Sequence, residues 1–110
     1  MTTSWDEAEL AHLSEITGLA SRLVTAENPY EVGLQLWGGA MSHPGKLAGD
    51  VQALWGSLTD WVERKPAEQD LARAEMVRAA YEWLALDLSA RGTVDRYLDY
   101  WLHDACGYDR

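Results

Sequence analysis

The candidate metal ligands in this sequence are histidines and carboxylates at helical spacing. Glu9 and His12 form a Glu-x-x-His pair, which places both side chains on one face of a helix. Di-iron bundles bring two such pairs together with two further glutamates, because each metal needs several converging ligands. Here the pattern occurs once: Tyr100 stands three residues before His103, and His43 falls in a predicted loop. The sequence therefore predicts no metal site.

Cys106 is the single cysteine and thus the one candidate for a thiol nucleophile. His103 lies three residues before it and could reach it on a helix, whereas Asp104 points elsewhere. The dipole at the C-terminal end of a helix opposes a thiolate, so an inert thiol is the expected form.

Phosphate binding and acid–base catalysis have equally weak signals. The glycine-rich segment 33–49 contains Gly45-Lys46, but Leu47 follows where a phosphate loop needs a hydroxyl, and no predicted strand precedes it. Carboxylate pairs such as Asp60 and Glu63 fall opposite the apolar stripes, as solvated groups do. The sequence therefore predicts a protein that binds no cofactor and is not an enzyme.

The elements that carry these residues are all predicted to be helices, because apolar residues recur at three- and four-residue spacing. The predicted helices run from the cap residue Ser4 to Val24, from the cap residue Asn28 to Met41, from Lys46 to Arg64, from Pro66 to Ala90 and from the cap residue Thr93 to Ala105. Ser4 and Glu7 have the spacing of a capping box, and Gly107 would close the last helix.

The apolar stripes predict which helix faces are buried. The third helix has the widest arc and should therefore lie at the centre, with Leu47, Val51, Leu54, Trp55, Leu58, Trp61 and Val62. The fourth helix is predicted to bury Leu71, Ala74, Val77, Tyr81, Leu84, Ala85 and Leu88. The fifth is predicted to bury Val94, Tyr97, Leu98, Trp101, Leu102 and Ala105. No hairpin turn separates alternating apolar runs. Residues 1–110 are thus predicted to form one all-α domain, a compact bundle of about five helices, orthogonal or up-down, without a sheet.

Composition narrows the choice of partner. Eighteen acidic against nine basic residues give a net charge of −9. Phosphate backbones and anionic lipid headgroups are bound by clustered cations, so neither nucleic acid nor a membrane is an expected partner. A single cysteine excludes an internal disulfide, no signal peptide is apparent, and no apolar run reaches the length of a membrane span. The sequence therefore predicts a cytoplasmic protein.

The acidity is concentrated on two predicted helices. Residues 6–15 carry four carboxylates, Asp6 and Glu9 among them, and no cation precedes Arg22. On the last helix, Asp95, Asp99 and Asp104 lie along one flank. Each helix is expected to present its carboxylates without a local positive partner. Aromatic residues are common at the energetic centres of interfaces. The predicted partner-binding residues are therefore Asp6, Glu9, Asp95, Asp99, Asp104, Tyr100 and Tyr108.

In size, helicity and acidity the chain is similar to small bacterial immunity and inhibitor proteins, although no motif identifies a family. The leading hypothesis is a non-enzymatic, acidic protein-binding domain that neutralises a basic partner such as a toxin or nuclease. A second hypothesis is a small-ligand-binding or catalytic bundle with a pocket near Trp37 and His43. A third is a structural module that forms homodimers or larger homo-oligomers.

Overall fold

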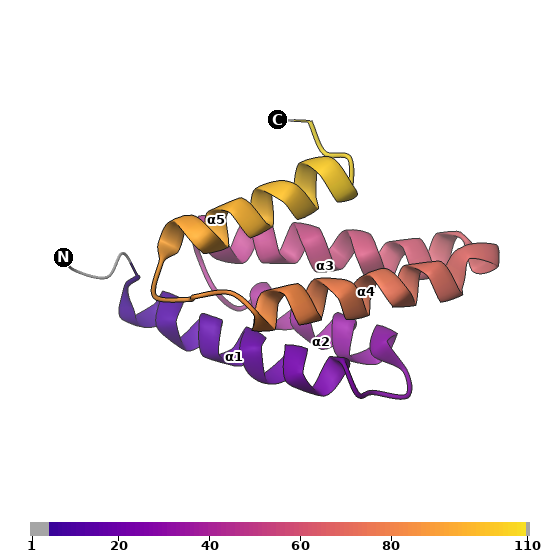
Figure 1. Ribbon diagram of the computed structural model, residues 1–110, viewed down its shortest axis with the longest axis horizontal. Coiled ribbons are helices and arrows are strands. Elements are labelled where there is room, and N and C mark those ends of the chain that lie inside the picture. The colour runs from indigo at the N-terminus through magenta and orange to yellow at the C-terminus, as the bar shows by residue number, and fades with distance from the viewer. Residues whose placement is uncertain (1–4, 110) are drawn as a thin grey trace.

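The computed structural model describes residues 5–109, and within them the chain is a bundle of helices without strands (Figure 1). The helices are α1 (Glu7–Leu23), α2 (Pro29–Ala40), α3 (Lys46–Arg64), α4 (Gln69–Leu84) and α5 (Arg91–Asp99). A 3₁₀ turn (Pro66–Glu68) precedes α4, and a π-helical segment (Tyr100–Ala105) continues α5. Successive helices alternate in direction along the long axis of a molecule measuring 48 × 30 × 24 Å. The predicted all-α bundle is confirmed, in its up-down form.

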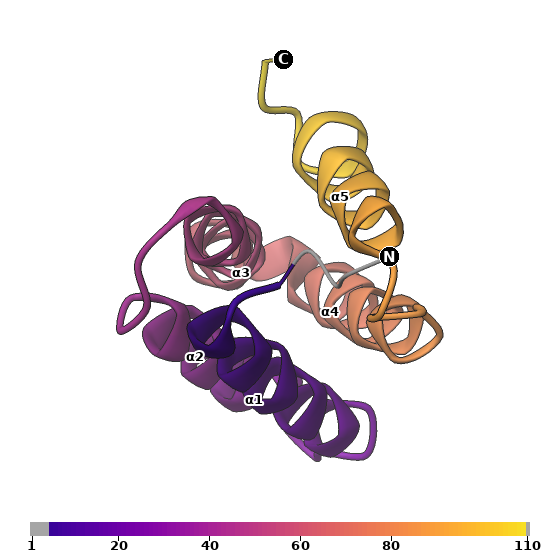
Figure 2. The ribbon, with the colours of Figure 1, turned by 90° about the vertical axis from the view of Figure 1, so that its left-hand side faces the viewer.

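The helices stack in three tiers, which Figure 2 shows end-on. α1 and α2 form one tier, α3 and α4 form the next, and α5 forms the third. α3 contacts α2, α4 and α5, which confirms its predicted central position. Its wide apolar arc is buried accordingly, at Leu47, Ala48, Val51, Leu54, Trp55, Leu58, Thr59 and Val62. No helix in the described part of the chain is long and apolar enough to cross a bilayer.

The start of α1 differs from the predicted one. Ser4, the predicted cap, lies outside the described residues. Asp6 is the N-cap, because its carboxylate accepts the Glu9 amide at 2.7 Å while Glu9 Oε1 accepts the Asp6 amide at 3.0 Å. This is a complete capping box, two residues later than predicted. Both carboxylates are therefore engaged in holding the helix end.

The buried face predicted for α4 was wrong. α4 buries its alanine-rich face, made of Ala72, Met76, Ala79, Ala80 and Trp83. Leu71, Tyr81 and Leu84 are instead exposed. Alanines allow close approach of neighbouring helices, and α4 packs against α1, α2 and α3 at once. Because three helices pack closely against α4, its face with small side chains is buried and its face with larger side chains is left exposed.

α4 also ends six residues before its predicted end at Ala90. The Asp87 carboxylate accepts hydrogen bonds from both the amide and the hydroxyl of Ser89, a local turn that competes with a helix. Trp5 fixes the same connection by donating its indole N–H to the Leu88 carbonyl at 2.7 Å. α5 then begins at Arg91 with Ala90 as its N-cap, three residues before the predicted cap Thr93.

The π-helical segment shifts the phase of the last helix by one residue. Tyr97, Leu98, Trp101 and Leu102 are buried as predicted, but Ala105 is exposed and Cys106 turns toward the core in its place. A wider turn explains this shift, because the Cys106 amide donates to the Trp101 carbonyl, five residues back, at 2.9 Å.

Candidate binding site

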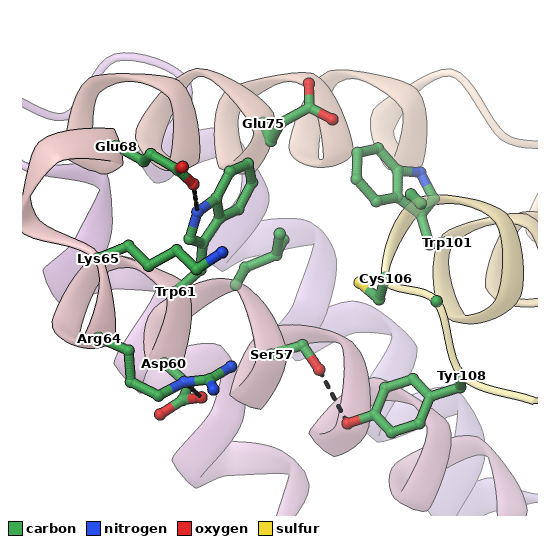
Figure 3. Close-up of a pocket in the computed structure, with 13 residues that line it drawn as sticks. Ser57, Asp60, Trp61, Arg64, Lys65, Glu68, Glu75, Trp101, Cys106 and Tyr108 are labelled. Atoms are coloured by element: carbon green, nitrogen blue, oxygen red, sulfur yellow. Dashed lines mark hydrogen bonds and ion pairs between the residues drawn. The ribbon is translucent and has the colours of Figure 1, made fainter.

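A groove lies between α3, the beginning of α4 and the C-terminal end of the described chain. We call it the Cys106 groove; it has a volume of about 550 Å³. In Figure 3, Trp61 and Glu68 stand on one side, and Trp101, Cys106 and Tyr108 on the other. The groove is lined by Ser57, Leu58, Asp60, Trp61, Arg64, Lys65, Glu68, Glu75, Trp101, Ala105, Cys106, Gly107 and Tyr108. Its walls are therefore mixed, with aromatic rings and charges of both signs.

The carboxylates of this groove are already paired. Glu68 accepts the Trp61 indole N–H at 2.7 Å, and Asp60 forms an ion pair with Arg64 at 2.5 Å, one helical turn away. Glu75 accepts two hydrogen bonds from Arg78, and this contact lowers the pKa of its carboxyl group. The groove thus has little unbalanced charge with which to attract a charged ligand.

The thiol in the groove is poorly suited to nucleophilic chemistry. Cys106 is half-buried, and desolvation together with the nearby Glu75 carboxylate raises the pKa of its thiol to about 11. His103 does not serve it as a base: it lines a different hollow, and its Nδ1 lies 2.8 Å from the Tyr108 carbonyl oxygen. At neutral pH the group remains a thiol, whereas the attacking species would be the thiolate.

A second hollow adjoins the groove and has a different character. We call it the Trp37 hollow; it measures about 380 Å³ and is lined by Leu34, Trp37, Gly56, Ser57, Thr59, Asp60, Glu63 and Tyr108. The Trp37 ring lies on α3 because position 56 is glycine: a Cβ there would come within 3.3 Å of the ring. The Tyr108 hydroxyl is 2.8 Å from Ser57 Oγ, as Figure 3 shows, and both residues line the groove as well as the hollow.

The Trp37 hollow combines exposed aromatic rings with carboxylates. Trp37 is 36% and Tyr108 47% exposed. Glu63 accepts a hydrogen bond from the Tyr30 hydroxyl at 2.5 Å, which fixes the carboxylate and raises the pKa of the tyrosine. Among the described residues that line the hollow there is no lysine or arginine. The partner of Asp60, Arg64, belongs to the lining of the Cys106 groove only.

The two predicted acidic helices, α1 and α5, meet near the residues at which they begin. Arg91, at the start of α5, lies 3.3 Å from Glu9 of α1 and 4.5 Å from the centre of the Trp5 ring. Glu9 therefore has a cation that its own helix does not supply. Because Asp6 and Glu9 also close the capping box, the structure assigns both residues a part in folding.

Asp95 and Asp99 lie in a groove that contains several cations. This third hollow, the Asp95 groove, is lined by Lys46, Asp50, Arg91, Asp95, Arg96, Asp99, Leu102 and His103. The hydrogen bond from Lys46 to Asp50 raises the pKa of the lysine, and the charge of Asp95 adds to this effect. The prediction of carboxylates without a local positive partner was wrong for these residues, because α3 and α5 bring their cations to the same place. Asp104 is exposed further along the chain.

The two predicted aromatic anchors have different surroundings. Tyr100 is exposed, but its hydroxyl accepts from Arg78 at 3.1 Å and its ring packs edge-on against Trp101. Tyr108 lies at the Trp37 hollow, far along the chain from the residues it faces on α3. Of the predicted partner-binding residues, Tyr108 is the one that the structure places beside other exposed aromatic and acidic side chains.

The single pocket predicted near Trp37 and His43 is two separate hollows. α2 ends at Ala40, so Trp37 faces α3 while His43, in the following turn, faces α1. There His43 stacks on His12, with Glu15 beside both rings. The sequence pattern paired His12 with Glu9, but the structure groups it with Glu15 and His43. These are the described residues that could hold a metal ion.

Comparison of the chain with protein-family models, with curated proteins and with solved structures found no match.

Proposed function

We propose that this chain is a non-enzymatic protein-binding domain that receives a basic protein at the Trp37 hollow. One observation carries the proposal. The hollow joins two exposed aromatic rings, Trp37 and Tyr108, to Glu63, a carboxylate that forms no ion pair with a described residue. Asp60 also lines the hollow, but it is paired with Arg64. Elsewhere on the predicted acidic surfaces, carboxylates stand next to arginine or lysine.

The physical chemistry of such a hollow favours a lysine or arginine side chain of the partner. A cation can lie on the face of the Trp37 ring while its charge is balanced by Glu63. Tryptophan and tyrosine contribute much of the binding energy in protein interfaces, since they bury a large area with few rotatable bonds. The net charge of −9 would speed the encounter with a basic surface and make it sensitive to salt.

The more specific form of the proposal is an inhibitor of immunity type. A toxin or nuclease that acts on nucleic acid presents cations to the phosphates of its substrate. Carboxylates on a small acidic domain can occupy those cations and so block the site. This form of the proposal goes with a cytoplasmic location.

The test compares two double variants that each remove two negative charges. Asp60→Asn with Glu63→Gln neutralises the Trp37 hollow, and Asp95→Asn with Asp99→Asn neutralises the Asp95 groove. The full-length chain is immobilised, and basic proteins are captured from lysate at low salt. We expect a captured protein that is released as salt rises, and that the first double variant binds about tenfold or more weakly while the second binds normally.

If both double variants lose the partner to the same degree, binding depends on total charge, and the proposed site is wrong. If the wild-type chain captures no basic protein, the proposed function itself is wrong.

A small-ligand site is the second candidate function, and the volume of the Cys106 groove favours it. Trp61 and Tyr108 flank this groove, so a ligand would change the tryptophan fluorescence of the protein. A screen of small aromatic compounds that leaves this fluorescence unchanged would argue against it.

A further inference from the structure

Two histidines from distant parts of the chain meet beside α1. His12 lies on α1 and His43 in the turn between α2 and α3, yet their rings stack with centroids 4.2 Å apart and planes 17° from parallel. Glu15 follows His12 by one helical turn. Its Oε1 is 3.4 Å from His43 Nε2 and 3.9 Å from His12 Nε2. One nitrogen or oxygen from each of the three residues lies within 4.8 Å of the other two.

The buried member of this cluster has no hydrogen-bond partner. His12 is 1% exposed, and neither of its ring nitrogens is hydrogen-bonded to any described residue. Buried polar groups in folded proteins are almost always satisfied, so two unsatisfied nitrogens on one ring require an explanation. Burial and the neighbouring His43 also lower the pKa of the His12 imidazole, and the neutral imidazole is the form that binds metals.

Gly39 of α2 provides the space for the third group. A Cβ at this position would come within 2.8 Å of Glu15 Oε1, closer than side chains pack. The Glu15 carboxylate therefore lies directly on the backbone of α2, on the side where His43 emerges. A side chain at position 39 would therefore force the Glu15 carboxylate to shift from this position.

We propose that His12, Glu15 and His43 form a binding site for a divalent transition metal ion, and that zinc is the ion they fit best. Two imidazole nitrogens and one carboxylate oxygen are a donor set that zinc accepts, with a fourth position left for water or another ligand. Magnesium and calcium prefer oxygen ligands alone, so this set selects against them. The ion would satisfy the buried nitrogen of His12 that faces Glu15.

The spacing of the donor atoms is close to what a tetrahedral ion requires. With bonds of about 2.0–2.1 Å, two ligand atoms of tetrahedral zinc lie roughly 3.3 Å apart. The separations from Glu15 Oε1 to the two histidines, 3.4 and 3.9 Å, are near this value. Because the rings are nearly parallel, binding requires the His43 ring to rotate until its lone pair converges with that of His12. His43 stands in a turn, where such a rotation disturbs little of the core.

A small pocket gives access to the cluster. It measures about 160 Å³ and is lined by Asp6, Ala8, Glu9, His12, His43, Pro44, Gly45, Leu47 and Ala48. This pocket provides an entry path and room for the fourth ligand. A bound ion would connect α1 to the turn before α3, and so link two tiers of the bundle.

The experiment is titration of the purified full-length chain with ZnCl₂ in the presence of excess Mg²⁺, followed by calorimetry. Co²⁺ serves as a spectroscopic probe of tetrahedral coordination. We expect one zinc ion per chain and a rise in melting temperature on binding. His43→Ala, Glu15→Gln and Gly39→Ala should each weaken zinc binding by at least about tenfold, because each removes or displaces one ligand. His43 lies outside the helices, so of the three variants His43→Ala should disturb folding least.

His103→Ala is the matched control, since it removes the one remaining histidine of the sequence and leaves the cluster intact. It should bind zinc like the wild type. Three results would overturn the proposal: no saturable binding by the wild type, equal binding by His43→Ala and the wild type, or binding abolished by Mg²⁺. The last would assign the ion to surface carboxylates. None of these results bears on the Trp37 hollow, which shares no residue with the cluster.

Discussion

The Asp95 groove and the Trp37 hollow both carry carboxylates, but their surroundings give them different roles. In the Asp95 groove, acids and bases from α3 and α5 lie together, and Arg91 extends the network to Glu9 and Trp5 of the first tier. In the Trp37 hollow, Glu63 is held by a tyrosine hydroxyl and faces exposed rings. The charges of the Asp95 groove connect helices. In the Trp37 hollow Asp60 is paired with Arg64, whereas Glu63 forms no ion pair with a described residue and is available to a partner. Variants in the groove should therefore change stability, and variants in the hollow should change binding.

The largest effect is expected from Trp37→Ala. An exposed aromatic at an interface centre contributes about 2 kcal/mol or more to binding, so affinity for the basic partner should fall by roughly thirtyfold. The free energy of unfolding should fall by about 1 kcal/mol, less than the loss in binding, because the ring is 36% exposed. Binding measured by calorimetry and stability measured by urea denaturation separate the two effects. If Trp37→Ala lowers the free energy of unfolding by more than the free energy of binding, the different roles given to the Trp37 hollow and the Asp95 groove are wrong.

The sequence predicted the parts of the fold that depend on local pattern. The wide arc of α3 correctly placed this helix at the centre, and Pro29 and Pro66 correctly marked the beginning of helical segments. α4 was harder because it has two apolar faces, and the choice between them depends on how closely α1 and α3 approach. Periodicity along one helix carries no information about that distance.

The candidate sites depend on long-range contacts that spacing cannot reveal. His43 reaches His12 because the turn after α2 returns to α1, and Arg91 reaches Glu9 because α5 starts above the N-terminal end of α1. Tyr108 was selected for its aromatic character, and the structure gave it the neighbours Ser57 and Trp37. One local signal for the histidine cluster was present: His12 and Glu15 share a helix face, as Glu9 and His12 do.

A second prediction concerns Arg91, the cation that connects the Asp95 groove to Glu9 of α1. Arg91→Ala removes the ion pair with Glu9 and the contact with the Trp5 ring. It should lower the free energy of unfolding by about 1–2 kcal/mol, since a partly exposed ion pair and a cation–π contact each contribute about 1 kcal/mol or less. Partner affinity should remain within a factor of about two of the wild-type value. Arg96→Ala, in the same groove but without these two contacts, is the control and should cost less stability.

The smallest effect is expected from Tyr30→Phe, which removes the hydroxyl that holds Glu63 in the hollow. At neutral pH the variant should lose about 0.5 kcal/mol of stability and a few-fold in partner affinity, because the hydrogen bond is near the surface and its carboxylate becomes mobile. The bond raises the pKa of Tyr30 in the folded state above the ordinary value of about 10. Its contribution is therefore complete below pH 10 and decreases as the pH rises beyond that, where the unfolded chain ionises first.

Urea denaturation at pH 7 and at pH 11 should show a stability difference between wild type and variant that shrinks at the higher pH. A difference that grows with pH would mean that Tyr30 does not donate to Glu63, and that the carboxylate of the hollow is held in another way.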